Sequence, residues 1–300
     1  MTTKIIALGT GSAFTMKNYQ TNFIIKRNGK NLLVDCGGDV RFSLRDQGLT
    51  FKDIDAVYIS HQHGDHIGGL EFLAFTRYFT KRAMEQAKAL ARTVDPDNCP
   101  DPLPLPVLFC ERGMVRTLWD HSLRGGLEGL EGIDARLETY FNIHPVDKNG
   151  SFEWAGQKFE IVQSLHVSAK YSIVDSFGLM FTDESLIDGL ENNVDWAGAP
   201  PMTSKRIFIT TDIQYAPESA MKAYYQEANV IIHDCETSEF PSGVHAHYNY
   251  LRTLPMDIKA KMILTHFSDN VFDAWDAWQQ KAKEDGFTGF VKPGVIYESD

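Results

Sequence analysis

Cysteine is scarce in this chain, and so are long apolar runs. Four cysteines occur in 300 residues, and no two form a Cys-x-x-Cys pair, which argues against a structural zinc knot or a disulfide scaffold. The first apolar run, residues 5–8 before Gly9, has only four residues, far fewer than a secretory signal or a membrane span needs. We therefore expect a cytoplasmic protein with reduced thiols and no membrane association.

Positive charge is also in deficit. The chain has 29 Lys and Arg against 40 Asp and Glu, a formal net charge of −11. Proteins that bind long nucleic acids usually present a basic surface, because phosphate neutralisation drives much of the affinity. A bound metal pair would add local positive charge, but the overall balance favours a small substrate over a large RNA.

The apolar pattern predicts strands mixed with helices along the whole chain. Short apolar runs bounded by turn residues predict strands at 4–8, 22–25, 31–34, 56–60, 107–110, 158–162, 177–181, 206–210, 230–233 and 261–265. Helical spacing predicts helices ending near 47 and covering 71–92, 114–123, 218–226, 248–254 and 272–285. Loops are expected at 125–132 and in the proline-rich segment 95–106. We expect one layered α/β domain over residues 1–300, with an insertion at about 76–150.

A dense group of histidines and one aspartate follows the strand expected at 56–60. Its members are His61, His63, Asp65 and His66. A turn at a strand end can point alternate side chains the same way, so His61 and His63 can reach one ion while Asp65 and His66 face a second. Imidazole and carboxylate ligands suit zinc, and also manganese or iron. The segment therefore predicts the heart of a two-metal site.

Four residues cannot complete two ions, so further ligands should follow other strands. Candidates are His166 after 158–162, Asp212 after 206–210 and His266 after 261–265. Asp212 is the natural bridging ligand, because a carboxylate has two oxygens. Asp35 also ends an apolar run. It can support a ligand histidine, since metal-bound imidazoles usually donate their other N–H to a carboxylate or carbonyl, or it can cap a turn.

These motifs resemble those of the metallo-β-lactamase superfamily, especially its ribonuclease Z-like branch of phosphodiesterases. The matching segments are Leu8–Ser12, His61–Leu70 and Leu264–Ser268, and the likeness spans roughly residues 4–270. The resemblance implies a four-layer αββα sandwich. It also implies that one metal is held by His61, His63 and His166, the other by Asp65, His66 and His266, and both by Asp212.

A second segment is similar to the same branch. Residues 231–236 contain a histidine–acid pair, and a histidine that opens a helix follows in 244–248. In that branch this arrangement supports the scissile phosphate and the leaving group. The best positional match makes Asp234 the acid and His247 the proton donor. His245, two residues earlier, is the alternative donor.

The resemblance implies a metal-dependent phosphodiesterase that hydrolyses a small phosphodiester, with a cyclic nucleotide the best candidate, through a metal-bridged hydroxide. The alternative is a tRNA 3′-processing endonuclease. Ribonuclease Z grips tRNA with a long arm between the positions of His166 and Asp212, but here that interval is short and residues 183–205 are acidic. A carboxylic ester, thioester or lactam hydrolase is a weaker alternative, because such enzymes seldom carry the second segment. Relatives in this branch are often dimers, so a homodimer is expected by analogy.

Overall fold

The computed structural model describes residues 3–91, 101–183, 205–216, 221–292, 294 and 296–298. Most of the acidic segment between His166 and Asp212 and half of the proline-rich segment 95–106 lie outside these residues. No helix within the described ranges is long and apolar enough to cross a membrane.

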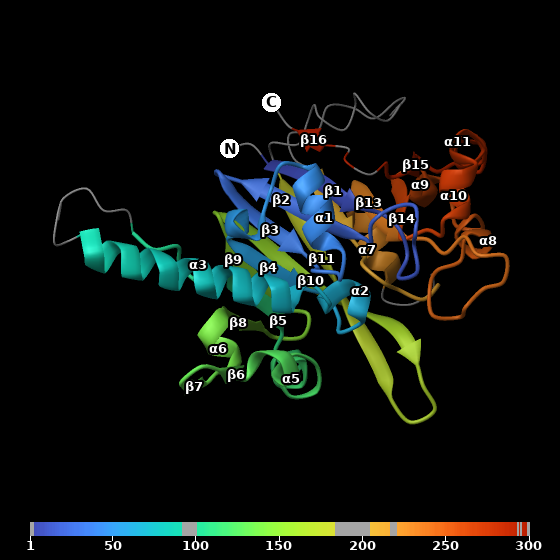
Figure 1. Ribbon diagram of the computed structural model, residues 1–300. Coiled ribbons are helices and arrows are strands. Elements are labelled where there is room, and N and C mark those ends of the chain that lie inside the picture. The colour runs from blue at the N-terminus through green and yellow to red at the C-terminus, as the bar shows by residue number, and fades with distance from the viewer. Residues whose placement is uncertain are drawn as a thin grey trace.

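Two β-sheets face each other at the centre of the molecule (Figure 1). Within the described residues each sheet has seven strands, in the orders β16-β1-β2-β3-β4-β5-β8 and β15-β14-β13-β12-β11-β10-β9. The first sheet contains β1 (Thr3–Gly9), β2 (Asn22–Arg27), β3 (Lys30–Val34), β4 (Ala56–Ile59), β5 (Val107–Glu111), β8 (Asn142–Val146) and β16 (Ile296–Glu298). The second contains β9 (Ser151–Trp154), β10 (Gln157–Ser168), β11 (Ile173–Asp183), β12 (Lys205–Ile209), β13 (Val230–Asp234), β14 (Met262–Thr265) and β15 (Gly289–Phe290).

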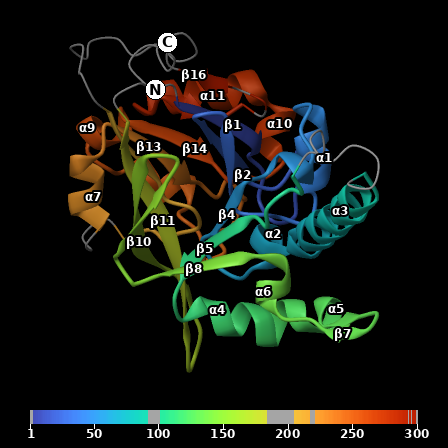
Figure 2. The same ribbon diagram turned by 90° about the vertical axis from the view of Figure 1, so that its left-hand side faces the viewer.

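Helices cover the outer face of each sheet, which gives the expected αββα layers. Figure 2 shows α1 and α3 on one flank and α7 and α9 on the opposite one. The first set of helices is α1 (Val40–Asp46), α2 (Gly64–Ile67) and α3 (Leu70–Ala91). The second set is α7 (Met221–Glu227), α8 (Tyr248–Leu251), α9 (Met256–Lys259), α10 (Asn270–Asp273) and α11 (Trp275–Glu284).

The sheets pack against each other through apolar side chains. Tyr58 and Phe109 of the first sheet stack on Phe152 of the second, with ring centroids 5.8 and 4.1 Å apart. Phe152 in turn stacks on Phe159 at 5.2 Å. Such rings bury a large apolar area and hold the two sheets at a fixed separation.

The strand order decides where the polar side chains gather. β3, β4 and β5 run parallel in one sheet, and β12, β13 and β14 run parallel in the other. Segments that follow parallel strands meet at the carboxyl edge of the sheet, where open α/β sheets bind ligands. The segments after β3, β4, β12, β13 and β14 all carry candidate site residues.

The structure corrects three expectations about local structure. β10 continues to Ser168, so His166 lies within the strand, where the register with β11 shifts between Leu165 and Val167. Residues 125–132 are not a simple loop, since they hold most of α5 (Arg124–Leu127) and all of β6 (Gly129–Leu130), which pairs with β7 (Ile133–Asp134). The helix expected at 114–123 is α4 (Met114–Thr117) followed by a π-helical stretch, η2 (Leu118–Leu123).

The insertion expected at about 76–150 stays a prediction. β5 and β8 lie within it, yet both belong to the first sheet. The material outside the sheets includes the end of α3, which extends to the left in Figure 1. It also includes the region from α4 to α6 (Leu137–Tyr140), which lies below the sheets in the same view. The assignment of residues 1–300 to a single domain stays a prediction.

Candidate metal centre

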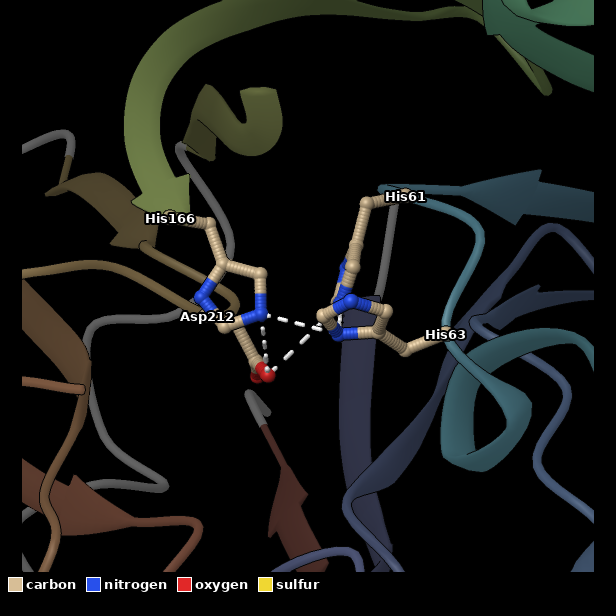
Figure 3. Close-up of side chains that lie close together, drawn as sticks. All are labelled: His61, His63, His166 and Asp212. Atoms are coloured by element: carbon tan, nitrogen blue, oxygen red, sulfur yellow. Dashed lines mark hydrogen bonds and ion pairs between the residues drawn. The ribbon is translucent and has the colours of Figure 1, made fainter. Parts of the chain in front are cut away.

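Three imidazoles and one carboxylate form the first group of the site. His61 and His63 come from the segment after β4, His166 from β10 and Asp212 from the segment after β12. Figure 3 shows the four side chains pointing toward one another. His63 Nδ1 lies 3.1 Å from His61 Nε2 and 2.9 Å from His166 Nε2. Asp212 Oδ2 lies 3.7 Å from His61 Nε2 and 3.5 Å from His166 Nε2.

The second group shares Asp212 with the first. It adds Asp65 and His66 from α2 and His266 from the end of β14. Asp212 Oδ1 lies 3.3 Å from His66 Nε2 and 3.6 Å from His266 Nδ1. Asp65 Oδ2 lies 3.2 Å from His66 Nε2. The two oxygens of Asp212 thus face different groups, which is the geometry expected of a bridging ligand.

The donor set fits a pair of divalent ions. His66 Nε2 and both ring nitrogens of His266 are buried without a hydrogen-bond partner in the described part of the chain. Leaving buried polar atoms unpaired costs about 1–3 kcal/mol each, and metal coordination would remove that cost for His66 Nε2 and for one nitrogen of His266. Imidazole nitrogens and carboxylate oxygens at these separations suit zinc, manganese or iron.

Hydrogen bonds behind the two groups orient the imidazoles. His66 Nδ1–H donates to Asp35 Oδ2 at 2.8 Å, and Asp35 also accepts the backbone N–H and the hydroxyl of Ser60, both at 2.8 Å. His166 Nδ1–H donates to the carbonyl of Val244 at 2.9 Å. Each bond favours the tautomer with the proton on Nδ1, which leaves the lone pair of Nε2 to coordinate a metal. The structure therefore gives Asp35 the supporting position.

Backbone strain also gathers at this site. Asp35, Thr211 and His266 have φ values of 60°, 53° and 60°, in the left-handed region that residues other than glycine rarely adopt. Such conformations cost about 1–3 kcal/mol each and cluster at functional sites. Asp35 and His266 belong to the site, and Thr211 directly precedes Asp212.

The electrostatics of the first group favour metal binding. Burial lowers the pKa of His61 well below its usual value and that of His166 to about 4, even though Asp212 opposes both shifts. These imidazoles are therefore neutral near pH 7, the form that coordinates a metal. Burial alone would lower the pKa of His66, but Asp212 and Asp35 outweigh it and raise it. Burial likewise acts to raise the pKa of Asp212, yet the surrounding imidazoles lower it.

A second acid–histidine pair borders the cluster. Asp234 Oδ2 accepts from His245 Nδ1–H at 2.8 Å and from the backbone N–H of Ile213 at 2.9 Å. His245 Nδ1 also lies 3.8 Å from Asp212 Oδ2. Burial acts to lower the pKa of His245, but Asp234 and Asp212 outweigh burial and raise it to about 10. His245 is therefore charged at neutral pH in the metal-free protein, and its Nε2 has no hydrogen-bond partner among the described residues.

His247 does not contact Asp234. Its Nε2–H donates to the carbonyl of Ser238 at 2.9 Å, and its Nδ1 accepts from the backbone N–H of Asn249 at 3.2 Å, which caps α8. Both ring nitrogens are thus engaged in holding the local backbone. The prediction that Asp234 positions His247 is wrong, and His245, the alternative donor, has that place. The sequence favours His247 because it opens a helix. A histidine at a helix start can cap the helix as well as take part in catalysis, so the position alone does not distinguish the two roles.

A cavity of about 420 Å³ opens beside the first group. Its lining includes His61, His63, Gln62, Glu111, Thr117 and Lys148. The volume lies within the range typical of small-molecule sites. Apart from the two histidines, no sequence pattern predicts these residues, since β5, α4 and the turn after β8 meet only in the fold.

Family and structural comparisons bear on the site. The family model described as Anti-Pycsar protein Apyc1 matches residues 3–297. The Anti-Pycsar protein Apyc1 of Paenibacillus harenae is 30% identical over 292 residues, which cover 97% of this chain and 98% of that protein. The protein of the same name from Bacillus phage vB_BsuM-Goe3 is 30% identical over 276 residues, covering 90% of this chain and 91% of the relative.

Solved structures share the fold at low sequence identity. The metallo-β-lactamase fold protein YhfI from Bacillus subtilis superposes with a TM-score of 0.65 at 16% identity, covering 100% of both chains. Unliganded yeast PDE1 gives a TM-score of 0.61 at 12% identity and covers 99% of both chains. The short form of human tRNase Z gives 0.58 at 14% identity and covers 98% of both. The chain has the metallo-β-lactamase fold and belongs to the Anti-Pycsar protein Apyc1 family.

Proposed function

We propose that this protein is a metal-dependent phosphodiesterase that hydrolyses a cyclic nucleotide. The observation that carries the proposal is the Asp234–His245 pair beside a cluster suited to two metals. A phosphodiester needs both a nucleophile near neutral pH and a proton for the leaving oxygen, and the site can supply both. Family membership and the fold shared with yeast PDE1 agree with this chemistry.

Seven residues would hold the metals. We assign one ion to His61, His63 and His166, the other to Asp65, His66 and His266, and a bridging position to Asp212. Zinc is our first choice, with manganese and iron as alternatives. When bound, two such ions lower the pKa of a bound water and offset the charge of the phosphoryl oxygens.

The protein's own groups supply and position the proton. His245 donates its Nε2 proton to the departing alkoxide oxygen as the P–O bond breaks. Asp234 holds the imidazolium through Nδ1 and keeps it charged. General-acid catalysis of this kind contributes about 10²–10⁴-fold to the rate. No covalent bond between enzyme and phosphate is required.

The size of the site favours a small substrate. A cavity of about 420 Å³ accommodates a mononucleotide, and the chain as a whole carries a net charge of −11, which disfavours a long RNA. A tRNA 3′-processing endonuclease remains the alternative, supported only by the fold shared with human tRNase Z. The homodimer and the cytoplasmic location expected from the sequence stay predictions.

The proposal is tested by offering the zinc- or manganese-loaded protein a panel of cyclic mononucleotides, cyclic dinucleotides and a precursor tRNA. The control is Asp212→Ala, which removes the bridging carboxylate. Cleavage of a cyclic nucleotide by the wild type and not by the variant supports the proposal. Trimming of the tRNA with the nucleotides untouched would overturn it.

A further inference from the structure

The segment that carries His245 forms a closed loop. We call residues 237–246 the His245 loop; it connects the segment after β13 to the start of α8. Its two ends are joined, because the backbone N–H of Glu236 donates to the carbonyl of Ala246 at 3.0 Å and that of Tyr248 donates to the carbonyl of Glu236 at 2.9 Å. Glu236 and His247 thus face each other across the neck of the loop.

The side chain of Glu236 fills the inside of this loop. It is 7% exposed, and its two carboxylate oxygens accept hydrogen bonds from Ser238 Oγ at 2.6 Å, Ser242 Oγ at 2.9 Å and Ser242 N–H at 3.0 Å. A carboxylate offers only acceptors, so one side chain gathers donors from both arms of the loop. A buried acid without a salt bridge is costly, and here the loop's own donors offset that cost.

His247 fastens the same loop from its other side. It is 3% exposed, and its ring links the carbonyl of Ser238 to the backbone N–H of Asn249 in α8. The first arm of the loop is therefore tied to the helix that follows it. Ser238 is bound by both Glu236 and His247, so the two side chains act on one point of the loop.

The loop delivers two groups to the metal cluster. The carbonyl of Val244 accepts from His166 Nδ1–H at 2.9 Å, and the next residue, His245, contacts Asp234 at 2.8 Å. A shift of the loop would therefore move the proton donor, His245. It would at the same time break the hydrogen bond between Val244 and the metal ligand His166.

We propose that Glu236 and His247 are positioning residues that hold the His245 loop so that Val244 and His245 are aligned with the cluster. The catalytic part of this inference rests on the proposed function, whereas the part concerning His166 rests on metal binding alone. It assigns to His247 a role different from that of proton donor. It also gives Glu236, which the sequence did not single out, a place in the site.

The test compares Glu236→Ala, Glu236→Gln and His247→Ala with wild type at saturating zinc. A misplacement of about 1 Å can cost on the order of 10²-fold in rate, so we expect kcat to fall about 10- to 100-fold for the alanine variants, with KM changed less than about threefold. Glutamine keeps one acceptor oxygen, so Glu236→Gln should recover part of the loss. Zinc affinity, measured by chelator competition, should fall about tenfold because His166 loses its partner.

A double-mutant cycle separates positioning from general stability. In a His245→Ala background the group that the loop aligns is gone, so Glu236→Ala should lower kcat by less than about threefold. The matched control is Asp53→Ala, since Asp53 also accepts two hydrogen bonds within a loop, from Thr50, without contacting the cluster. This control should leave kcat and zinc affinity unchanged. Circular dichroism checks folding, and Ser242→Ala replaces Glu236→Ala if that variant does not fold.

Two results would overturn the inference. One is a folded Glu236→Ala protein with unchanged kcat and zinc affinity. The other is an equal loss of kcat in the wild-type and His245→Ala backgrounds. If wild type cleaves no nucleotide, the proposed function fails, and the zinc titration alone decides whether the loop positions His166.

Discussion

Asp35→Asn should weaken metal binding without unfolding the protein. Asp35 is 3% exposed and accepts three hydrogen bonds of 2.8 Å, two from Ser60 and one from His66. Asparagine has the same shape and tolerates the left-handed backbone at this position, where φ is 60°. Its amide group, however, turns one acceptor into a donor, so at least one of the three donors loses its partner.

The magnitude follows from the bonds that are lost. A hydrogen bond to a charged group contributes about 1.5–3 kcal/mol, and losing a partner behind a metal ligand typically costs about 10- to 100-fold in affinity or activity. We therefore expect zinc affinity to fall by about 1.4–2.8 kcal/mol.

Competition titration of the metal-free protein with a chromophoric chelator measures this loss. Asp55→Asn is the matched control, because Asp55 accepts a backbone N–H from Asn31 at 2.8 Å at the opposite end of β4. The control should bind zinc like wild type. If Asp35→Asn also bound zinc within about threefold of wild type, the reasoning about Asp35 would be refuted.

Three further predictions follow from the site. His245→Gln should lower kcat about 10²–10⁴-fold at pH 7. It should also remove the decline in rate that we expect of wild type when the pH rises past the pKa of His245, about 10; an unchanged pH–rate profile would exclude His245 as the acid. In the metal-free protein, the pKa of His166, about 4, lies below the ordinary value of 6.5, so the unfolded chain binds the proton more readily. His166 should therefore cost up to about 3 kcal/mol of unfolding free energy as pH falls from 6.5 to 4, a loss that urea unfolding should find absent in His166→Gln. Finally, removal of the metal by a chelator should lower the Tm of wild type, because a metal that binds only the folded state stabilises it. The Tm of a variant in which Asp212 and His66 are both replaced by alanine should not change. Equal shifts in both proteins would contradict the residues assigned as metal ligands.

The fold was predictable where apolar patterning and turn residues agree. The runs at 22–25, 31–34 and 56–60 became β2, β3 and β4, and the helical pattern from residue 71 became α3. The apolar pattern does not predict the short strands β8 and β9. β8 contains a proline and alternates weakly, so its place at the sheet edge comes from tertiary pairing, and β9 has only four residues. The extent of β10 beyond Val162 was missed for a similar reason, since polar residues interrupt its apolar run.

The candidate site was predictable to the extent that each polar residue follows an apolar strand. That rule predicted that seven residues meet, and the structure gathers all seven from the two sheets, although His166 lies within β10 rather than after it. It failed between His245 and His247, because both follow the same strand and only loop geometry decides which imidazole meets Asp234. It could not reveal Glu236 either, since a buried acid that bonds only to its own loop leaves no pattern in the sequence.

The most direct test of the account is to titrate the metal-free protein with zinc while following hydrolysis of a cyclic nucleotide. The account predicts that the rate rises with added zinc and reaches its plateau at two equivalents per chain, because the two groups joined by Asp212 act together. Full activity in the absence of metal, or no hydrolysis at any zinc concentration, would contradict it.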